Sequence, residues 1–156
     1  MANEIRTKPI AKATFTCTLA SLADGSARQS TMINNSSNYP AAIVYLRIKS
    51  GATAPTAGAV YEIYLLRGDD AATSTYRTDN AGAADAALTI ENAQLLGTLV
   101  VTATASKNFY GEFDTSPLGP LGPEWGIAIR NKSGQALSAT EADHLKEYVY
   151  YVPEVQ

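Results

Sequence analysis

The sequence predicts an all-β fold, a single-domain antiparallel jelly roll or two-sheet β-sandwich of about eight strands. Short segments alternate apolar and polar residues with a period of two, and clusters of Gly, Pro, Asn, Asp and Ser separate them. No long amphipathic helical pattern alternates with these segments, which argues against a parallel α/β sheet. At 156 residues and 16.5 kDa the chain has the size of one domain. We expect residues 1–12 to form a flexible N-terminal arm and residues 13–156 to form the β-sandwich domain.

The strands of the first half follow from this alternation. Residues 13–22 alternate apolar side chains with threonines, the pattern of a half-buried strand, and a turn and a weaker strand follow. Residues 42–49 and 60–67 are the clearest strands, and we expect them to pair across the Ala/Thr/Pro loop between them. In the first of these two strands, Val44, Leu46 and Ile48 share one face, while Tyr45, Arg47 and Lys49 share the other.

The second half opens with a polar excursion over residues 68–87, longer than most loops of compact domains. Residues 83–96 are compatible with a short helix, but Thr89 and Ile90 are β-branched and disfavour it, so we expect a connection with local structure. Strands are expected at 97–104, 107–114, 125–129 and 147–152, with a Pro-stiffened loop at 116–123.

Charge and cysteine content exclude several classes of protein. The net charge of −3 and pI of about 5.1 do not indicate nucleic-acid binding, which requires clustered cations. Arg6, Lys8 and Lys12 form the one notable basic group, near the N-terminus. A lone cysteine, Cys17, forms no internal disulfide and fits synthesis in a reducing cytoplasm. We expect no membrane span and no signal peptide, because no sufficiently long apolar run occurs.

The residues that usually carry out catalysis are scarce. His144 is the single histidine and has no second histidine or cysteine ligand beside it, so we expect no metal, no cofactor and no enzyme activity. Asp69 and Asp70 do not follow the spacing of a calcium loop. Glu112 and Asp114 share a strand face, but no aromatic subsite pattern accompanies them as it would in a glycosidase.

Tyrosine provides the best indication of a binding surface. Nine of the thirteen aromatic residues are tyrosine, a residue enriched at protein–protein and protein–sugar contacts. The last expected strand carries tyrosine on both faces, so one face should meet the core and the other should be covered by a partner. The predicted interface residues are Arg6, Lys8, Tyr110, Leu118, Leu121, Trp125, Tyr148, Tyr150 and Tyr151.

The whole-chain pattern resembles small virion proteins of tailed bacteriophages, of the jelly-roll capsid decoration (cement) type. The resemblance rests on the polar N-terminal segment, residues 21–30, the turn at residues 34–36, and the strands at 44–49 and 60–67 with their Ala/Pro loop. It implies a homotrimer that is made in the host cytoplasm, binds the major capsid protein and stabilises the capsid surface.

Two alternatives remain open at this point. Tail and head–tail proteins of phages share the same pattern. A carbohydrate-binding module on a jelly-roll scaffold is indicated by Trp125 and the tyrosines, and it would be a monomer with an exposed aromatic platform.

Overall fold

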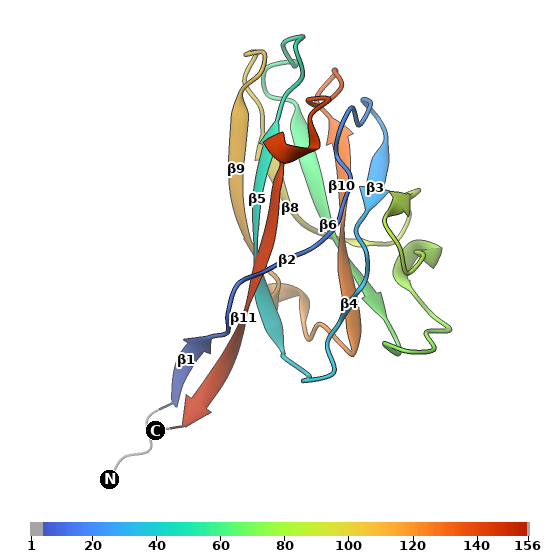
Figure 1. Cartoon of the computed structure of the whole chain (residues 1–156), viewed down its shortest axis with the longest axis vertical. Coiled ribbons are helices and arrows are strands. Elements are labelled where there is room, and N and C mark those ends of the chain that lie inside the picture. Colours follow the sequence, from blue (N-terminus) through green and yellow to red (C-terminus); the bar gives the residue numbers. More distant parts are fainter. Residues whose placement is uncertain (1–4, 156) are drawn as a thin grey trace.

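Two antiparallel sheets pack face to face in the computed structural model, which describes residues 5–155 and the side chains of residues 8–153 (Figure 1). Sheet A consists of β1 (Ile5–Pro9), β2 (Ala13–Thr14), β5 (Ala41–Lys49), β9 (Asn108–Asp114) and β11 (Leu145–Val155). Sheet B consists of β3 (Ala27–Gln29), β4 (Ile33–Asn34), β6 (Val60–Gly68), β7 (Ala86–Ala87), β8 (Gln94–Val100) and β10 (Glu124–Lys132). Three short 3-10 helices lie in the connections: η1 (Thr78–Asn80), η2 (Ser116–Leu118) and η3 (Glu141–Asp143).

The strand order is that of a jelly roll. Sheet A runs β1-β11-β5-β9, with β2 also on β11, and sheet B runs β7-β3-β10-β6-β8, with β4 also on β10. Without the short strands β1, β4 and β7, four strands remain in each sheet, and every connection except that from β6 to β8 crosses between the sheets. Two four-stranded sheets connected in this way form a jelly roll, so the predicted fold class is confirmed.

The core lies between the two sheets and is built by the predicted alternation. The residues of β5 alternate between half-buried and buried, and Val44, Leu46 and Ile48 point inward. β6 contributes Tyr61 and Ile63 from the opposite sheet, and both are fully buried. Because the side-chain period of a strand is two, one apolar face on each sheet suffices to define this core.

The expected pairing of the strands at 42–49 and 60–67 is wrong. β5 pairs with β11 and β9, whereas β6 pairs with β10 and β8, so the two strands lie in opposite sheets. Their inward faces meet across the core. Period-two alternation reveals which face of a strand is buried but not which strand is its neighbour, and both arrangements fit the same pattern.

The long strand expected at 13–22 is reduced to the two residues of β2. From residue 15 the chain crosses from sheet A to sheet B, and side chains satisfy its backbone N–H groups. Thr18 N–H donates to Asp85 Oδ2 at 3.0 Å, and Leu19 N–H donates to Glu141 Oε2 at 2.8 Å. Residues 83–96, expected to be a connection with local structure, contain β7 and the start of β8 and no helix.

The N-terminal segment contains a strand where the sequence predicts a loose arm. β1 pairs antiparallel with the end of β11, in the register Pro9↔Tyr151, and the two strands project from the sandwich as a ribbon (Figure 1). β11 lies at the other end of the chain from β1, so no pattern within either segment predicts that the two strands pair. Residues 1–4 of the predicted arm lie outside the described residues.

The polar excursion after β6 covers the outer face of sheet B. A second buried cluster, separate from the main core, forms between this face and residues 69–93. It comprises Met32, Leu66, Ala81 and Ala128, with Tyr64, Leu88, Ile90 and Ala93 packed against it. The chain thus buries both faces of the central part of sheet B.

Candidate interaction surface

The outer face of sheet A carries aliphatic and aromatic side chains that the described part of the chain leaves partly or largely exposed. We call this surface the sheet A face. β5 supplies Ile43 and Tyr45, β9 supplies Tyr110, and β11 supplies Leu145, Val149 and Tyr151, which alternate with inward-facing residues along each strand. In register, Ile43 lies opposite Val149, and Tyr110 lies opposite Arg47.

Tyrosines dominate the sheet A face. Tyr110 is 69% exposed, an unusual state for a large aromatic side chain. A shallow hollow of about 370 Å³ adjoins it, lined also by Tyr45, Glu112 and Leu145. A hydrogen bond with Tyr151 is the main reason that the pKa of Tyr45 is raised to about 12, so the Tyr45 hydroxyl stays protonated at neutral pH.

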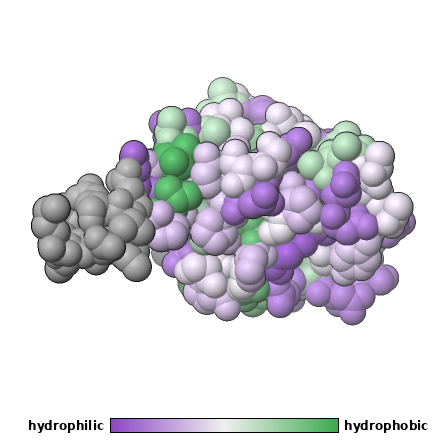
Figure 2. Space-filling model, turned by 90° about the horizontal axis from the view of Figure 1, so that it is seen from below, coloured by the Kyte–Doolittle hydropathy of each residue, from purple (hydrophilic) through white to green (hydrophobic). Residues whose placement is uncertain are grey.

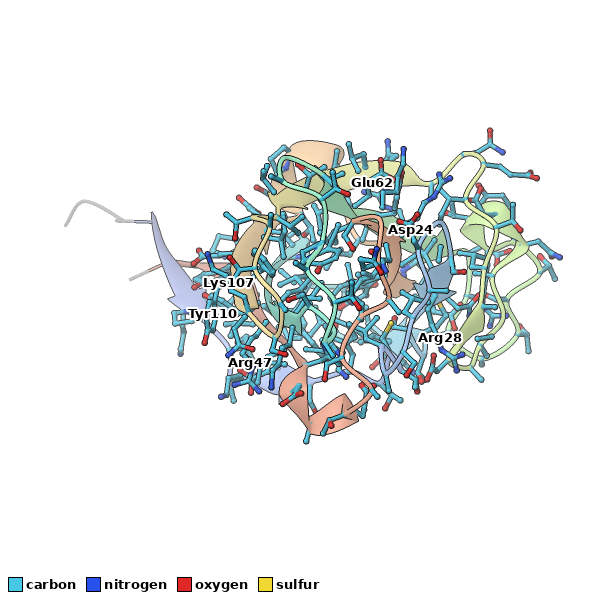
Figure 3. The ribbon with its side chains drawn as sticks, turned by 90° about the horizontal axis from the view of Figure 1, so that it is seen from above. Asp24, Arg28, Arg47, Glu62, Lys107 and Tyr110 are labelled. Atoms are coloured by element: carbon cyan, nitrogen blue, oxygen red, sulfur yellow. The ribbon has the colours of Figure 1, made fainter. Side chains whose placement is uncertain are left out.

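Charged residues at the margin of this surface are held by contacts within the chain. Lys12 pairs with Glu147 at 3.0 Å, and Lys49 pairs with Asp143 at 3.0 Å. Arg47 Nε donates to the backbone oxygen of Asp143 at 3.0 Å. Seen from above, Arg47, Lys107 and Tyr110 lie along one side of the molecule, away from Arg28 and Glu62 (Figure 3). Charged side chains also lie among the tyrosines, because Glu147 and Glu112 stand opposite Tyr45 and Arg47 stands opposite Tyr110. The sheet A face therefore mixes aromatic, aliphatic and charged groups.

Three predicted interface residues lie in the core instead, which corrects the sequence interpretation. Leu121 and Trp125 are 0% exposed, and Tyr150 is 7% exposed. Trp125 Nε1 donates to the Tyr150 hydroxyl at 2.9 Å, so each aromatic residue satisfies the polar group of the other. None of the three can touch a partner in the folded chain.

The other predicted residues divide between interior and surface. Leu118 and Tyr148 are half-buried and pack against the core, and the Tyr148 ring lies 5.2 Å from that of Trp125. Tyr110 and Tyr151 belong to the sheet A face. The remaining two lie in β1, where Lys8 is exposed and the Arg6 side chain lies outside the described side chains.

Ile43, Tyr45, Leu145 and Val149 are the members of the sheet A face that the prediction omits. The alternation over residues 42–49 places Tyr45 on the other face of the strand from Val44. This pattern was sufficient to identify Tyr45 as a residue of an outer face. Leu145 and Val149 carry no comparable signal, because an aliphatic residue in a strand is as often core as surface.

The remaining chemically active side chains have structural contacts. His144 is buried, which lowers its pKa, and its Nδ1 accepts a hydrogen bond from Lys49 N–H at 3.3 Å. Arg67 and Asp69, parts of an Arg-Gly-Asp tripeptide, both bind backbone groups of the chain itself. Among residues 5–155, no cluster of three or more His, Cys, Asp or Glu residues is placed to hold a metal ion. No helix in this part of the chain has the length and apolar character needed to cross a bilayer.

Cys17 is expected to be unreactive in the folded protein. It is 1% exposed, and burial raises its pKa from 9.0 to about 12, which leaves roughly a thousandfold less thiolate at pH 8. Alkylation by iodoacetamide, followed by mass spectrometry, should therefore be much slower in buffer than in urea. Equal rates would show that the segment around Cys17 opens readily. Because the unfolded thiol ionises first, this group also lowers stability as the pH rises from about 9 toward 12.

No known protein family, curated protein or solved structure matches this chain. The sheet A face and the projecting ribbon are two prominent surfaces of the molecule that a partner could bind.

Proposed function

We propose that this protein is a non-enzymatic structural protein of a phage virion, a capsid decoration protein that binds the major capsid protein through the sheet A face. The observation that carries the binding role is the contrast between the two outer faces. The chain covers the centre of sheet B with residues 69–93, whereas on sheet A it leaves Tyr110 exposed and Tyr45, Leu145 and Val149 half-buried. Accessible tyrosine and aliphatic side chains on one sheet face are typical of a protein interface.

The physical character of the sheet A face supports protein binding. Tyr45, Tyr110 and Tyr151 offer large rings with few rotatable bonds, so ordering them on binding costs little entropy. The ion pairs of Lys12 and Lys49 already fix the margin of the surface. A rigid strand surface that is organised before binding loses less free energy when it meets its partner.

The ribbon of β1 and β11 supports assembly in a second way. It extends sheet A beyond the sandwich. Seen from below, the body is mainly hydrophilic, with a small hydrophobic area beside the part drawn in grey (Figure 2). The capsid setting and the homotrimer rest on the resemblance described above, because a jelly roll by itself hosts many functions.

A single substitution tests the sheet A face. Tyr110→Ala should weaken binding to capsids by about tenfold or more, because an aromatic residue that anchors an interface contributes about 1.4 kcal/mol or more. Co-sedimentation of the purified protein with decoration-free capsids, titrated over concentration, measures the change. Tyr76→Ala is the matched control, since Tyr76 is 63% exposed but lies on a different surface. Equal effects of both variants would remove the sheet A face from the proposal.

The solution mass separates this proposal from its alternatives. Light scattering coupled to size exclusion should give three times 16.5 kDa for a homotrimer. A tail or head–tail protein remains the nearest alternative, and binding to tails but not to capsids would favour it. The carbohydrate-binding module loses one of the residues that indicated it, because Trp125 is buried, and keeps the exposed tyrosines.

A further inference from the structure

A second hollow lies outside sheet A, between the end of β6, the loop that follows it and the start of β8. It has a volume of about 300 Å³ and is lined by Leu65, Arg67, Tyr76, Thr78, Asn92 and Gln94. We call it the Tyr76 cleft. The lining joins one exposed aromatic ring to several amide, hydroxyl and guanidinium groups, a mixture that the sheet A face does not have.

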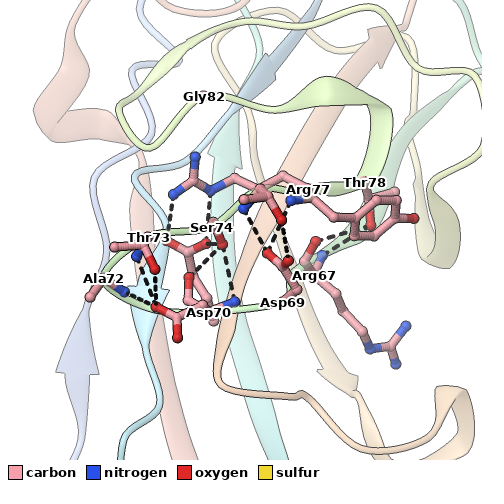
Figure 4. A network of polar contacts seen from close by, with 12 residues as sticks. Arg67, Asp69, Asp70, Ala72, Thr73, Ser74, Arg77, Thr78 and Gly82 are labelled. Carbon is pink, nitrogen blue, oxygen red and sulfur yellow. Dashed lines mark hydrogen bonds and ion pairs between the residues drawn. The ribbon is translucent and has the colours of Figure 1, made fainter.

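Tyr76 is held in its exposed position by the loop around it. The Asp69 carboxylate accepts the N–H of Tyr76 at 3.0 Å, and Asp69 N–H donates to the Tyr76 carbonyl at 3.2 Å. Figure 4 shows the carboxylates of Asp69 and Asp70 accepting hydrogen bonds from groups of this loop, with the Arg67 side chain directed away from the loop. The hydrogen bonds from Tyr76 and Thr75 lower the pKa of Asp69 to about 2. The Asp69 carboxylate is therefore ionised at neutral pH and keeps accepting these hydrogen bonds. The 63% exposed ring is thus fixed on an anchored backbone.

The Arg67 side chain fixes another wall of the cleft. Its guanidinium donates to the carbonyl oxygens of Pro120 at 2.9 Å and Leu118 at 2.7 Å. It also donates to Gln94 Oε1, which orients the amide of Gln94. Within the described part of the chain, the Gln94 Nε2 group has no hydrogen-bond partner, so its two N–H groups are available to a ligand.

Asn92 lies in the wall of the cleft formed by residues 92–94, and hydrogen bonds to Asp79 hold the backbone of this segment. The Asp79 carboxylate accepts the backbone N–H groups of Glu91 at 3.1 Å, Asn92 at 2.7 Å and Ala93 at 3.0 Å. The Asn92 side-chain amide is exposed and makes no hydrogen bond to another described residue. An aromatic ring and two free amide groups are therefore presented together on two segments, the loop of Tyr76 and residues 92–94, and the backbone of each is held by hydrogen bonds within the chain.

We propose that the Tyr76 cleft binds a carbohydrate. The face of a tyrosine ring stacks on the C–H face of a pyranose, and the amides of Asn92 and Gln94 can each donate to and accept from sugar hydroxyls. Arg67 is occupied by carbonyl oxygens, and the chain carries a net charge of −3, so an anionic ligand such as a nucleic acid is disfavoured. This inference goes beyond the proposed capsid role and does not depend on it, because none of the lining residues belongs to sheet A.

Affinity electrophoresis tests the cleft. Native gels containing soluble β-glucan, xylan, galactomannan or bacterial O-polysaccharide should retard the protein on at least one glycan. Tyr76→Ala should weaken this binding by about tenfold or more, because stacking of aromatic surface contributes on the order of 1 kcal/mol or above. Tyr76→Phe should retain it, since the ring remains, and Asn92→Ala should weaken it several-fold.

Tyr110→Ala is the matched control, because Tyr110 is equally prominent, at 69% exposure, on the sheet A face. It should leave glycan retardation unchanged. The proposal is overturned if no gel retards the protein, if Tyr76→Ala runs like the unsubstituted chain, or if Tyr110→Ala abolishes the retardation. Capsid binding is measured in a separate assay, so failure of one proposal leaves the other intact.

Discussion

Replacing Trp125 with alanine should lower the free energy of unfolding by about 3–5 kcal/mol, the usual loss for a large aromatic residue removed from a core. Trp125 is 0% exposed, and its ring lies 5.2 Å from Tyr148 and 6.0 Å from Tyr150, in edge-to-face arrangements. The substitution also removes the indole N–H that donates to the Tyr150 hydroxyl at 2.9 Å. That hydroxyl would then lie in the core without its donor, which adds to the loss.

Urea denaturation followed by circular dichroism measures this effect. Tyr110→Ala is the control, because an exposed residue usually changes stability by no more than about 0.5 kcal/mol. A loss below about 1 kcal/mol for Trp125→Ala would contradict the assignment of Trp125 to the core. It would also make Trp125 a candidate again for the exposed aromatic platform of a carbohydrate-binding module.

The burial of Trp125 could have been read from the sequence. Trp125, Ile127 and Ile129 alternate with Gly126 and Ala128, so the second face of β10 carries very small residues. A strand with large apolar residues on one face and small residues on the other is typical of a strand covered on both sides. The structure agrees, because a Cβ atom placed on Gly126 would lie 2.8 Å from Met32 Sδ.

The fold class was predictable because it depends on local periodicity, whereas the neighbour relations were not. Alternation assigned the buried face of β5 correctly. It gave no information on which sheet each strand joins, because strand pairing in a jelly roll is set by contacts between distant parts of the chain. The pairing of β1 with β11 is the extreme case, since it joins Ile5 to Val155.

The two candidate binding surfaces differ in how far the sequence reveals them. Tyr110 alternates with the inward-facing Phe109 and Gly111, so its place on an outer face follows from its own strand. Tyr76 lies in a polar excursion without periodicity. Its position depends on the side chain of Asp69, on a bridge between Gly68 and Arg77, and on the distant loop that binds Arg67. Only the assembled network shows that the backbone of Tyr76 is held in place.

A buried ion pair is one of the contacts that attach the excursion carrying Tyr76 to sheet B. Arg77 Nε lies 2.7 Å from Glu124 Oε2, and its Nη2 lies 3.1 Å from Oε1, so the guanidinium binds the carboxylate with both arms. Ser74 Oγ also donates to Glu124 at 2.7 Å. The Glu124 side chain is only 5% exposed, so its charge depends on these donors.

Arg77→Ala should therefore lower the free energy of unfolding by about 3–5 kcal/mol, because it leaves a buried carboxylate without its counter-charge. Denaturation measures the total, and amide hydrogen exchange should show faster opening at Thr75, Tyr76 and Thr78. The double variant Arg77→Met with Glu124→Leu should recover much of the loss, since an apolar pair of similar volume leaves no unpaired charge.

Lys132 is the matched control for this ion pair, because it lies 3.5 Å from Glu62 at the surface, with 48% of its side chain exposed. Lys132→Ala should change stability by about 0.5 kcal/mol or less, as exposed pairs usually do. If Arg77→Ala were equally mild, Glu124 would be satisfied by Ser74 and water alone. The loop would then be held mainly by the apolar cluster around Leu66 and Ala81, and the Tyr76 cleft would persist without the ion pair.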